Sequence, residues 1–129
     1  MNVKAMFVNE DTVPYAHLIV SGKKLIETRT KNMLLPLVGE RVAIVSTRKG
    51  RPAMVVGYAT VNSYSFCPVN MLDMWRQETM IPKGDTYDNL GKRNGRQGKW
   101  FYELYQAESC KPYALPENTV RHGRSWCEW

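Results

Sequence analysis

The chain has 129 residues and a mass of 14.9 kDa, with 43% apolar residues, 23% charged residues and a formal charge of +6. This length predicts one domain, residues 1–129, with enough apolar material for a buried core, so neither intrinsic disorder nor a disulfide-stapled miniprotein is required. No apolar run approaches the roughly 18 residues of a membrane span, and residues 1–10 lack the pattern of a signal peptide. The three cysteines form no CxxC pair, which favours a reducing compartment, so we expect a cytoplasmic protein.

The N-terminal quarter of the chain predicts a strand, a helix and a second strand. Residues 3–9 are mostly apolar and indicate a short strand. Asp11 and Thr12 followed by Pro14 are typical of a helix start with Thr12 as the cap, and Gly22 suits a helix end, so we expect a helix over residues 13–22. Residues 25–30 are rich in β-branched side chains, which favour an extended chain.

The rest of the chain predicts a sheet interrupted by one helix. After a loop over residues 31–40, we expect strands over 41–48 and 52–66, joined by a tight turn at Lys49-Gly50, with a bulge at Gly57. A helix over 68–80, a lid or binding loop over 81–98, a strand over 100–108 and a closing strand at 125–129 follow. This order predicts an α+β fold whose small, mostly antiparallel sheet curls into a barrel.

The excess positive charge is concentrated in residues 23–31, 48–51 and 92–99. The last stretch, KRNGRQGK, holds four cations, two glycines and no acidic residue. Such a stretch is commonly a solvated loop, but cations that approach a polyanion also gain affinity by releasing its counterions. Under the second interpretation, the residues expected to contact a nucleic-acid backbone are Lys49, Arg51, Lys92, Arg93, Arg96 and Lys99.

Residues 22–29, GKKLIETR, combine two cations with one carboxylate. In an extended chain Glu27 and Arg29 project from the same face, whereas Lys24 joins them only if it still lies in the turn after the helix. Two flanking cations would hold Glu27 ionised and leave donors free for an anionic or carbonyl-bearing ligand. The alternative is a surface ion pair on an edge strand, which would contribute little to stability.

This segment resembles the signature of the ASCH domain family, G-x-K-x-x-E-x-R, at Gly22, Lys24, Glu27 and Arg29. The preceding helix also resembles the family pattern, at Pro14, Tyr15, Ala16, Ile19 and Gly22. The strong match covers about the first 30 residues, and the late HGRSW run is weakly similar to the closing strand of the family.

The resemblance implies a PUA-like fold: a small β-barrel of about six mostly antiparallel strands with two or three helices, one of which caps the barrel beside a cleft. It also implies binding of RNA or nucleotides. Some short bacterial relatives are amidohydrolases of N4-acetylcytidine, in which the motif lysine supports a threonine nucleophile at the position of Glu27. A carboxylate cannot replace that hydroxyl nucleophile.

We therefore expect an RNA- or nucleotide-binding domain that recognises a nucleotide, a modified nucleoside or an unpaired base in a basic cleft. The alternative is an N4-acetylcytidine amidohydrolase or RNA-processing hydrolase, with Lys24 as base or electrostatic stabiliser and Glu27 as general acid or base. With only two histidines and no paired cysteines there is no ligand set at zinc spacing, so we expect no metal and no cofactor. The candidate ligand-binding residues are Tyr15, Lys24, Glu27, Arg29, Thr47 and Arg48.

Overall fold

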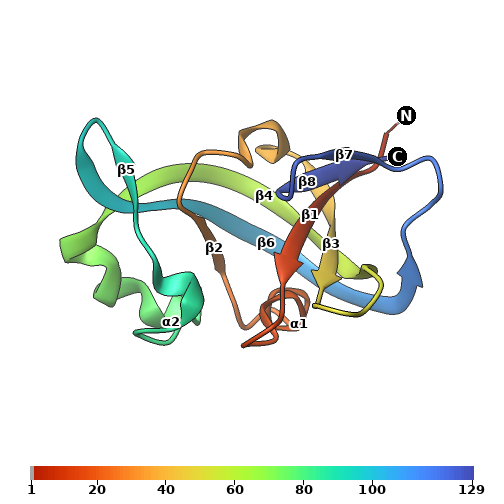
Figure 1. Cartoon of the computed structure of the whole chain (residues 1–129), viewed down its shortest axis with the longest axis horizontal. Coiled ribbons are helices and arrows are strands. Elements are labelled where there is room, and N and C mark those ends of the chain that lie inside the picture. The colour runs from red at the N-terminus through yellow and green to blue at the C-terminus, as the bar shows by residue number, and fades with distance from the viewer. Residues whose placement is uncertain (1) are drawn as a thin grey trace.

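The computed structural model describes residues 2–129 and is shown in Figure 1. Its strands are β1 (Lys4–Asn9), β2 (Ile26–Arg29), β3 (Arg41–Thr47), β4 (Met54–Pro68), β5 (Gly91–Arg93), β6 (Arg96–Ala114), β7 (Val120–His122) and β8 (Trp126–Glu128). The α-helices are short, α1 (Tyr15–Val20) and α2 (Arg76–Thr79), and the 3-10 helices are η1 (Leu35–Leu37), η2 (Val69–Trp75) and η3 (Thr86–Asp88).

All eight strands belong to one sheet, in the order β2-β6-β4-β3-β1-β8-β7, with β5 paired to β6. The β1–β3 pair is parallel and the other pairs are antiparallel. The mixed sheet with few helices confirms the α+β prediction, and it has eight strands where about six were expected. Within residues 2–129 the end strands β2 and β7 each pair on one side, so the sheet is not closed and the predicted barrel is not confirmed.

The two long strands β4 and β6 form the spine of the sheet (Figure 1). Their register shifts at Gly57, which confirms the bulge predicted there. A Cβ at Gly57 would lie 2.1 Å from the carbonyl oxygen of Glu108 and 2.6 Å from the Cγ1 of Val20. Glycine is therefore required at this position of β4, because Val20 of α1 and the main chain of β6 leave no room for a side chain.

Helix α1 packs on the main core through Tyr15, Ala16, Ile19 and Val20. Burial of a side chain such as Ile19 contributes about 1.5–3 kcal/mol. The predicted cap was wrong: α1 begins after Pro14 without a side-chain cap, and the Thr12 hydroxyl lies 3.4 Å from a carboxylate oxygen of Asp85 instead.

The interpretation of residues 68–98 was partly wrong. The expected helix over 68–80 is the 3-10 helix η2 followed by one α-helical turn, which stops where Met80 takes a left-handed φ of 58°. The expected loop over 81–98 contains η3 and a tight β5–β6 hairpin. Its turn residues Asn94 and Gly95 have φ values of 51° and 79°, as a two-residue hairpin turn requires.

The strand expected at residues 125–129 is present as β8, but it pairs with both β1 and β7 as an inner strand and does not close the sheet. Val3 and Trp129 exchange two main-chain hydrogen bonds, so the two ends of the described chain lie side by side (Figure 1). No helix within residues 2–129 is long and apolar enough to cross a membrane.

Candidate functional site

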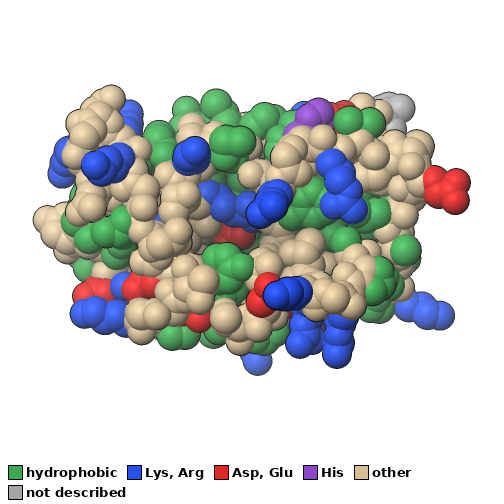
Figure 2. Space-filling model, in the orientation of Figure 1, with side chains coloured by type: hydrophobic (Ala, Val, Ile, Leu, Met, Phe, Trp, Pro, Cys, Tyr) green, Lys and Arg blue, Asp and Glu red, His purple; other side chains and the backbone are tan. Residues whose placement is uncertain are grey.

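A cavity of about 470 Å³ opens between α1, β1, β2 and the β7–β8 turn; we call it the motif cavity. Figure 2 shows a hollow near the middle of this face, with Lys and Arg side chains above it. Four cations and one carboxylate line it: Lys24, Arg29, Arg121, Arg124 and Glu27. The motif cavity is therefore basic at its rim and holds a single negative charge.

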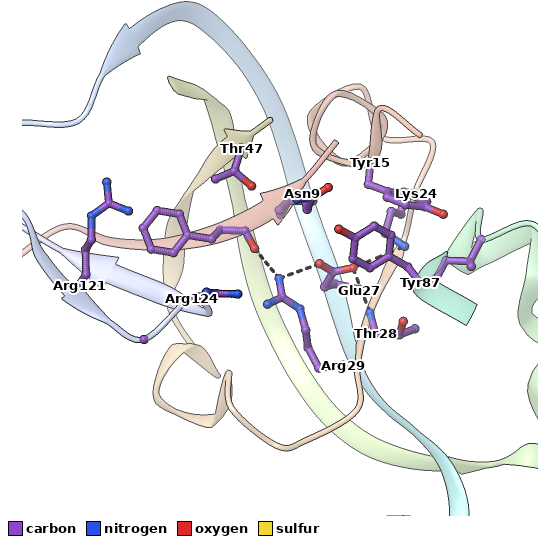
Figure 3. Close-up of a pocket in the computed structure, with 14 residues that line it drawn as sticks. Asn9, Tyr15, Lys24, Glu27, Thr28, Arg29, Thr47, Tyr87, Arg121 and Arg124 are labelled. Carbon is purple, nitrogen blue, oxygen red and sulfur yellow. Dashed lines mark hydrogen bonds and ion pairs between the residues drawn. The ribbon is translucent and has the colours of Figure 1, made fainter. Parts of the chain in front are cut away.

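The local chain geometry brings the motif residues to this cavity. Gly22, with a φ of 79°, ends α1, and the N–H groups of Lys23 and Lys24 both donate to the carbonyl of Leu18. Lys24 thus still lies in the turn, and β2 begins only at Ile26. From β2, Glu27 and Arg29 project toward the same cavity, as Figure 3 shows.

Glu27 is held on several sides. Its Oε2 accepts a hydrogen bond of 2.9 Å from the Nη2 of Arg29, and its Oε1 accepts one of 3.0 Å from the main-chain N–H of Thr28. The Nζ of Lys24 lies 3.6 Å from Oε1. Arg29 also donates to the carbonyl oxygen of Phe7, at 2.5 Å, which ties β2 to β1 across the cavity (Figure 3).

Lys24 is completely buried. Its Nζ donates to the carbonyl oxygen of Thr79 and lies 5.0 Å from the centroid of the Tyr15 ring. An ammonium group in this position is bound by one carbonyl, one carboxylate and one aromatic face. Lys24 therefore joins α1, β2 and the end of α2.

Burial and pairing shift both ionisable groups. Burial lowers the pKa of Lys24 below its usual value, although the Glu27 carboxylate opposes the shift. For Glu27, burial acts to raise the pKa, but Arg29 and Lys24 outweigh it and the pKa lies below its usual value of 4.5. Glu27 is consequently an ionised acceptor and a poor proton donor at neutral pH.

The motif cavity also includes residues that the sequence did not single out. Tyr87 comes from the segment expected to be a lid or binding loop, and its ring stands edge-on to that of Tyr15 with centroids 5.8 Å apart. Arg121 lies in β7 and Arg124 in the β7–β8 turn, on either side of Gly123, and the guanidinium of Arg121 lies 5.1 Å from the centroid of the Phe7 ring. The feature of the sequence that could have indicated this basic wall of the cavity is the pair of arginines around a glycine near the end of the chain.

The other predicted ligand-binding residues divide into two groups. Tyr15 and Thr47 line the motif cavity, and Tyr15 donates a 2.9 Å hydrogen bond to Asp85. Arg48 is exposed in the β3–β4 connection and is not among the lining residues that the structure describes.

The residues expected to contact a phosphate backbone lie in separate places. Lys49 and Arg51 are exposed in the β3–β4 connection, and Lys92, Arg93 and Arg96 are exposed in the β5–β6 hairpin (Figure 1). Lys99 does not fit this role.

Lys99 is only 4% exposed and its Nζ donates a 2.8 Å hydrogen bond to the carbonyl of Tyr87. Burial lowers the pKa of Lys99 to about 8. Lys99 is buried because η3 covers this part of β6, and the Lys99 side chain reaches a main-chain carbonyl of η3.

Thr28 also contributes to the wall of the cavity, but it meets Glu27 through its main-chain N–H. Its hydroxyl is buried without a hydrogen-bond partner among the described residues and points away from the Glu27 carboxylate in Figure 3. His17, whose side chain is 59% exposed, bonds the buried Glu10 and lies outside the motif cavity.

No protein-family profile and no curated protein matches the sequence. Solved structures of an ASCH protein from Zymomonas mobilis do match. One has a TM-score of 0.67 at 24% identity, covering 86% of this chain and 73% of that chain. Two point mutants of that protein match with TM-scores of 0.70 and 0.64 at 20% and 23% identity. They cover 95% and 86% of this chain, and 85% and 76% of theirs. The chain thus has the fold of this ASCH protein, in agreement with the fold that the motif resemblance implies.

Proposed function

We propose that the motif cavity binds a nucleotide or an unpaired RNA base. The observation that carries this proposal is the charge arrangement: one pinned carboxylate, Glu27, within a cavity whose other charged lining residues are cations. The volume of about 470 Å³ lies within the range of about 300–1,000 Å³ typical of small-ligand sites.

The inner part of the cavity suits the edge of a base. Glu27 is an ionised acceptor, while Arg29 and Lys24 are donors whose directions are set by their bonds to Phe7 and Thr79. Donors and acceptors side by side at the end of a pocket are what the polar edge of a nucleobase requires. The Tyr87 ring supplies an aromatic wall beside them (Figure 3).

The rim suits phosphate. Arg121 in β7 and Arg124 in the β7–β8 turn are exposed and carry guanidinium groups that favour phosphate oxygens. Figure 2 shows further Lys and Arg side chains across the upper part of this face, from the β5–β6 hairpin toward β7 and β8. A single strand lying along this row would place one nucleotide in the cavity and its neighbours on the basic loops.

The β5–β6 hairpin also offers a stacking surface. The guanidinium of Arg93 lies 5.5 Å from the centroid of the Trp100 ring, and Trp100 packs against Tyr64 at 6.2 Å. Tyr64 is 46% exposed, so one aromatic face of this cluster is open to a base. Aromatic stacking contributes about 1–3 kcal/mol per base in single-strand binding.

The test is fluorescence anisotropy with a labelled RNA of mixed sequence, its DNA equivalent and single nucleoside monophosphates as competitors. Arg124→Ala should weaken binding at least fivefold, whereas Lys111→Ala, which removes an exposed cation from β6 outside the cavity, should change it little. Equal affinity of the two variants, or no binding at low salt, would show that the motif cavity is not the site.

The same cavity supports a second candidate, a hydrolase of N4-acetylcytidine nucleosides. The observation in its favour is Lys24, a cavity lysine whose lowered pKa eases its use as a base. Ionised Glu27 lacks the hydroxyl of the amidohydrolases. Chromatography of N4-acetylcytidine incubated with the protein separates the two candidates: conversion to cytidine by the natural sequence favours the enzyme, and Glu27→Thr is the variant expected to gain activity.

A further inference from the structure

A second cavity, of about 340 Å³, lies on the opposite side of β2 from the motif cavity; we call it the aromatic cavity. Three aromatic rings line it, those of Trp75, Phe101 and Tyr105, together with the aliphatic side chains of Leu25, Ile26 and Leu104. Trp75 and Phe101 meet edge to face with centroids 6.3 Å apart. The two cavities share no lining residue in the described chain.

The charges of the aromatic cavity are the reverse of those of the molecule. The chain has a formal charge of +6, yet the charged residues described as lining this cavity are two carboxylates, Glu78 and Glu103, with no Lys or Arg among them. Glu103 is partnered, because its Oε2 accepts a 3.1 Å hydrogen bond from Ser63.

Glu78 is not satisfied in the same way. Its Oε1 is buried and has no hydrogen-bond partner among residues 2–129. Leaving a buried carboxylate oxygen without a donor is costly, and natural structures contain few such atoms. The main chain of Glu78 is held at the cavity wall, since its carbonyl accepts a 2.9 Å hydrogen bond from the N–H of Leu25.

From these observations we infer that the aromatic cavity binds a small organic cation: an ammonium group carried on an aromatic or branched apolar body. The ammonium N–H groups donate to the carboxylate of Glu78 in the cavity wall, and the apolar body lies against Trp75 and Phe101. Aromatic rings favour cations over their faces, and the apolar body gains from leaving water. A neutral or anionic ligand of the same shape lacks the first of these gains.

The experiment uses phenethylamine as the probe, with 2-phenylethanol and 3-phenylpropionate as its neutral and anionic counterparts. Two-dimensional amide NMR of the full chain reports the position and affinity of each. Phenethylamine should shift the resonances of residues 75–78 and 101–105, and both counterparts should bind at least about tenfold more weakly. Equal binding of 2-phenylethanol would overturn the inference.

Variants separate recognition from folding. Glu78→Gln keeps the shape of the side chain and should weaken phenethylamine about tenfold, while Glu117→Gln, at an exposed position outside the cavity, should leave affinity unchanged. Trp75→Leu should weaken all three probes, and phenethylamine the most, because it removes apolar surface and also an aromatic ring that favours the cation. Retained affinity in Glu78→Gln would exclude the proposed contact. RNA binding at the motif cavity should be unchanged by Glu78→Gln, so the two proposals can fail independently.

Discussion

The Lys24 ammonium group donates a hydrogen bond to the main-chain carbonyl of Thr79, a residue 55 positions later in the chain. The residue before it, Glu78, accepts from the N–H of Leu25. These two contacts fasten the end of α2 to the start of β2, and they separate the motif cavity from the aromatic cavity. Lys24 therefore has a structural role in addition to lining the proposed ligand site.

This position predicts that Lys24→Ala destabilises the fold as well as weakening ligand binding. The change removes a fully buried side chain and leaves Glu27 without one of its two cations. We expect a loss of about 3 kcal/mol in the free energy of unfolding, measured by urea denaturation. The control is Lys23→Ala, at the exposed neighbouring position, for which less than about 0.5 kcal/mol is expected. Equal stabilities of the two variants would contradict the role of Lys24 as a tie.

Because of Glu27, we expect the folded chain to lose stability in acid. Its pKa is lower in the folded chain than its usual value of 4.5, so the unfolded state binds more protons as pH falls. The stabilisation is present above the usual pKa and is lost as pH falls through the folded one. Thermal melts between pH 3 and 7 of the natural chain and Glu27→Gln should therefore differ in slope below about pH 4.5, with the variant less stable at neutral pH. Parallel profiles would contradict this prediction.

Because of Lys99, we expect the stability of the folded chain to increase as pH rises above about 8. Its folded pKa of about 8 lies below the usual 10.5, so between these values the unfolded state holds the extra proton and stability rises with pH. The rise should amount to about 1–3 kcal/mol between pH 8 and 10. Lys99→Met should remove this rise, and the exposed Lys92→Met should keep it. An identical profile for Lys99→Met would mean that Lys99 is solvated.

The β5–β6 hairpin predicts a change in the salt dependence of RNA binding. Each phosphate contact to a single strand contributes about 0.7 to the slope of log affinity against log salt. Replacing Arg93 and Arg96 by Ala should lower that slope by up to about 1.4, measured by anisotropy over a salt series. Lys83→Ala, an exposed lysine in the segment after α2, is the single-charge control. An unchanged slope would identify the hairpin as solvated surface.

At Gly57 in β4, we expect that no larger residue is tolerated. A Cβ there would meet the Glu108 carbonyl oxygen at 2.1 Å, a main-chain atom that cannot rotate away. Gly57→Ala should therefore cost more than about 2 kcal/mol in chemical denaturation, and Asn62→Ala, at an exposed position of the same strand, should cost little. A small effect at Gly57 would require the β4–β6 pair to separate at low cost.

Local sequence determined much of the N-terminal part of the site. A glycine with left-handed φ ends α1, and β-branched residues extend β2, so Gly22 through Arg29 take their conformations for reasons visible within eight residues. The alternation of β2 also places Glu27 and Arg29 on one side. The ASCH signature could be identified for the same reason, since its spacing reflects this local turn.

The tertiary structure decided what those residues meet. Lys99 looked like one more cation of a basic loop, yet pairing of β5 with β6 and the cover of η3 bury it. Arg121 and Arg124 reach the motif cavity because β8 pairs with β1, and no pattern near residue 24 indicates that contact. The sequence also could not show that the sheet stays open, with β2 and β7 at the ends of the strand order. Strand pairing is a long-range property, and the preferences of single residues carry no information about which strand edges meet.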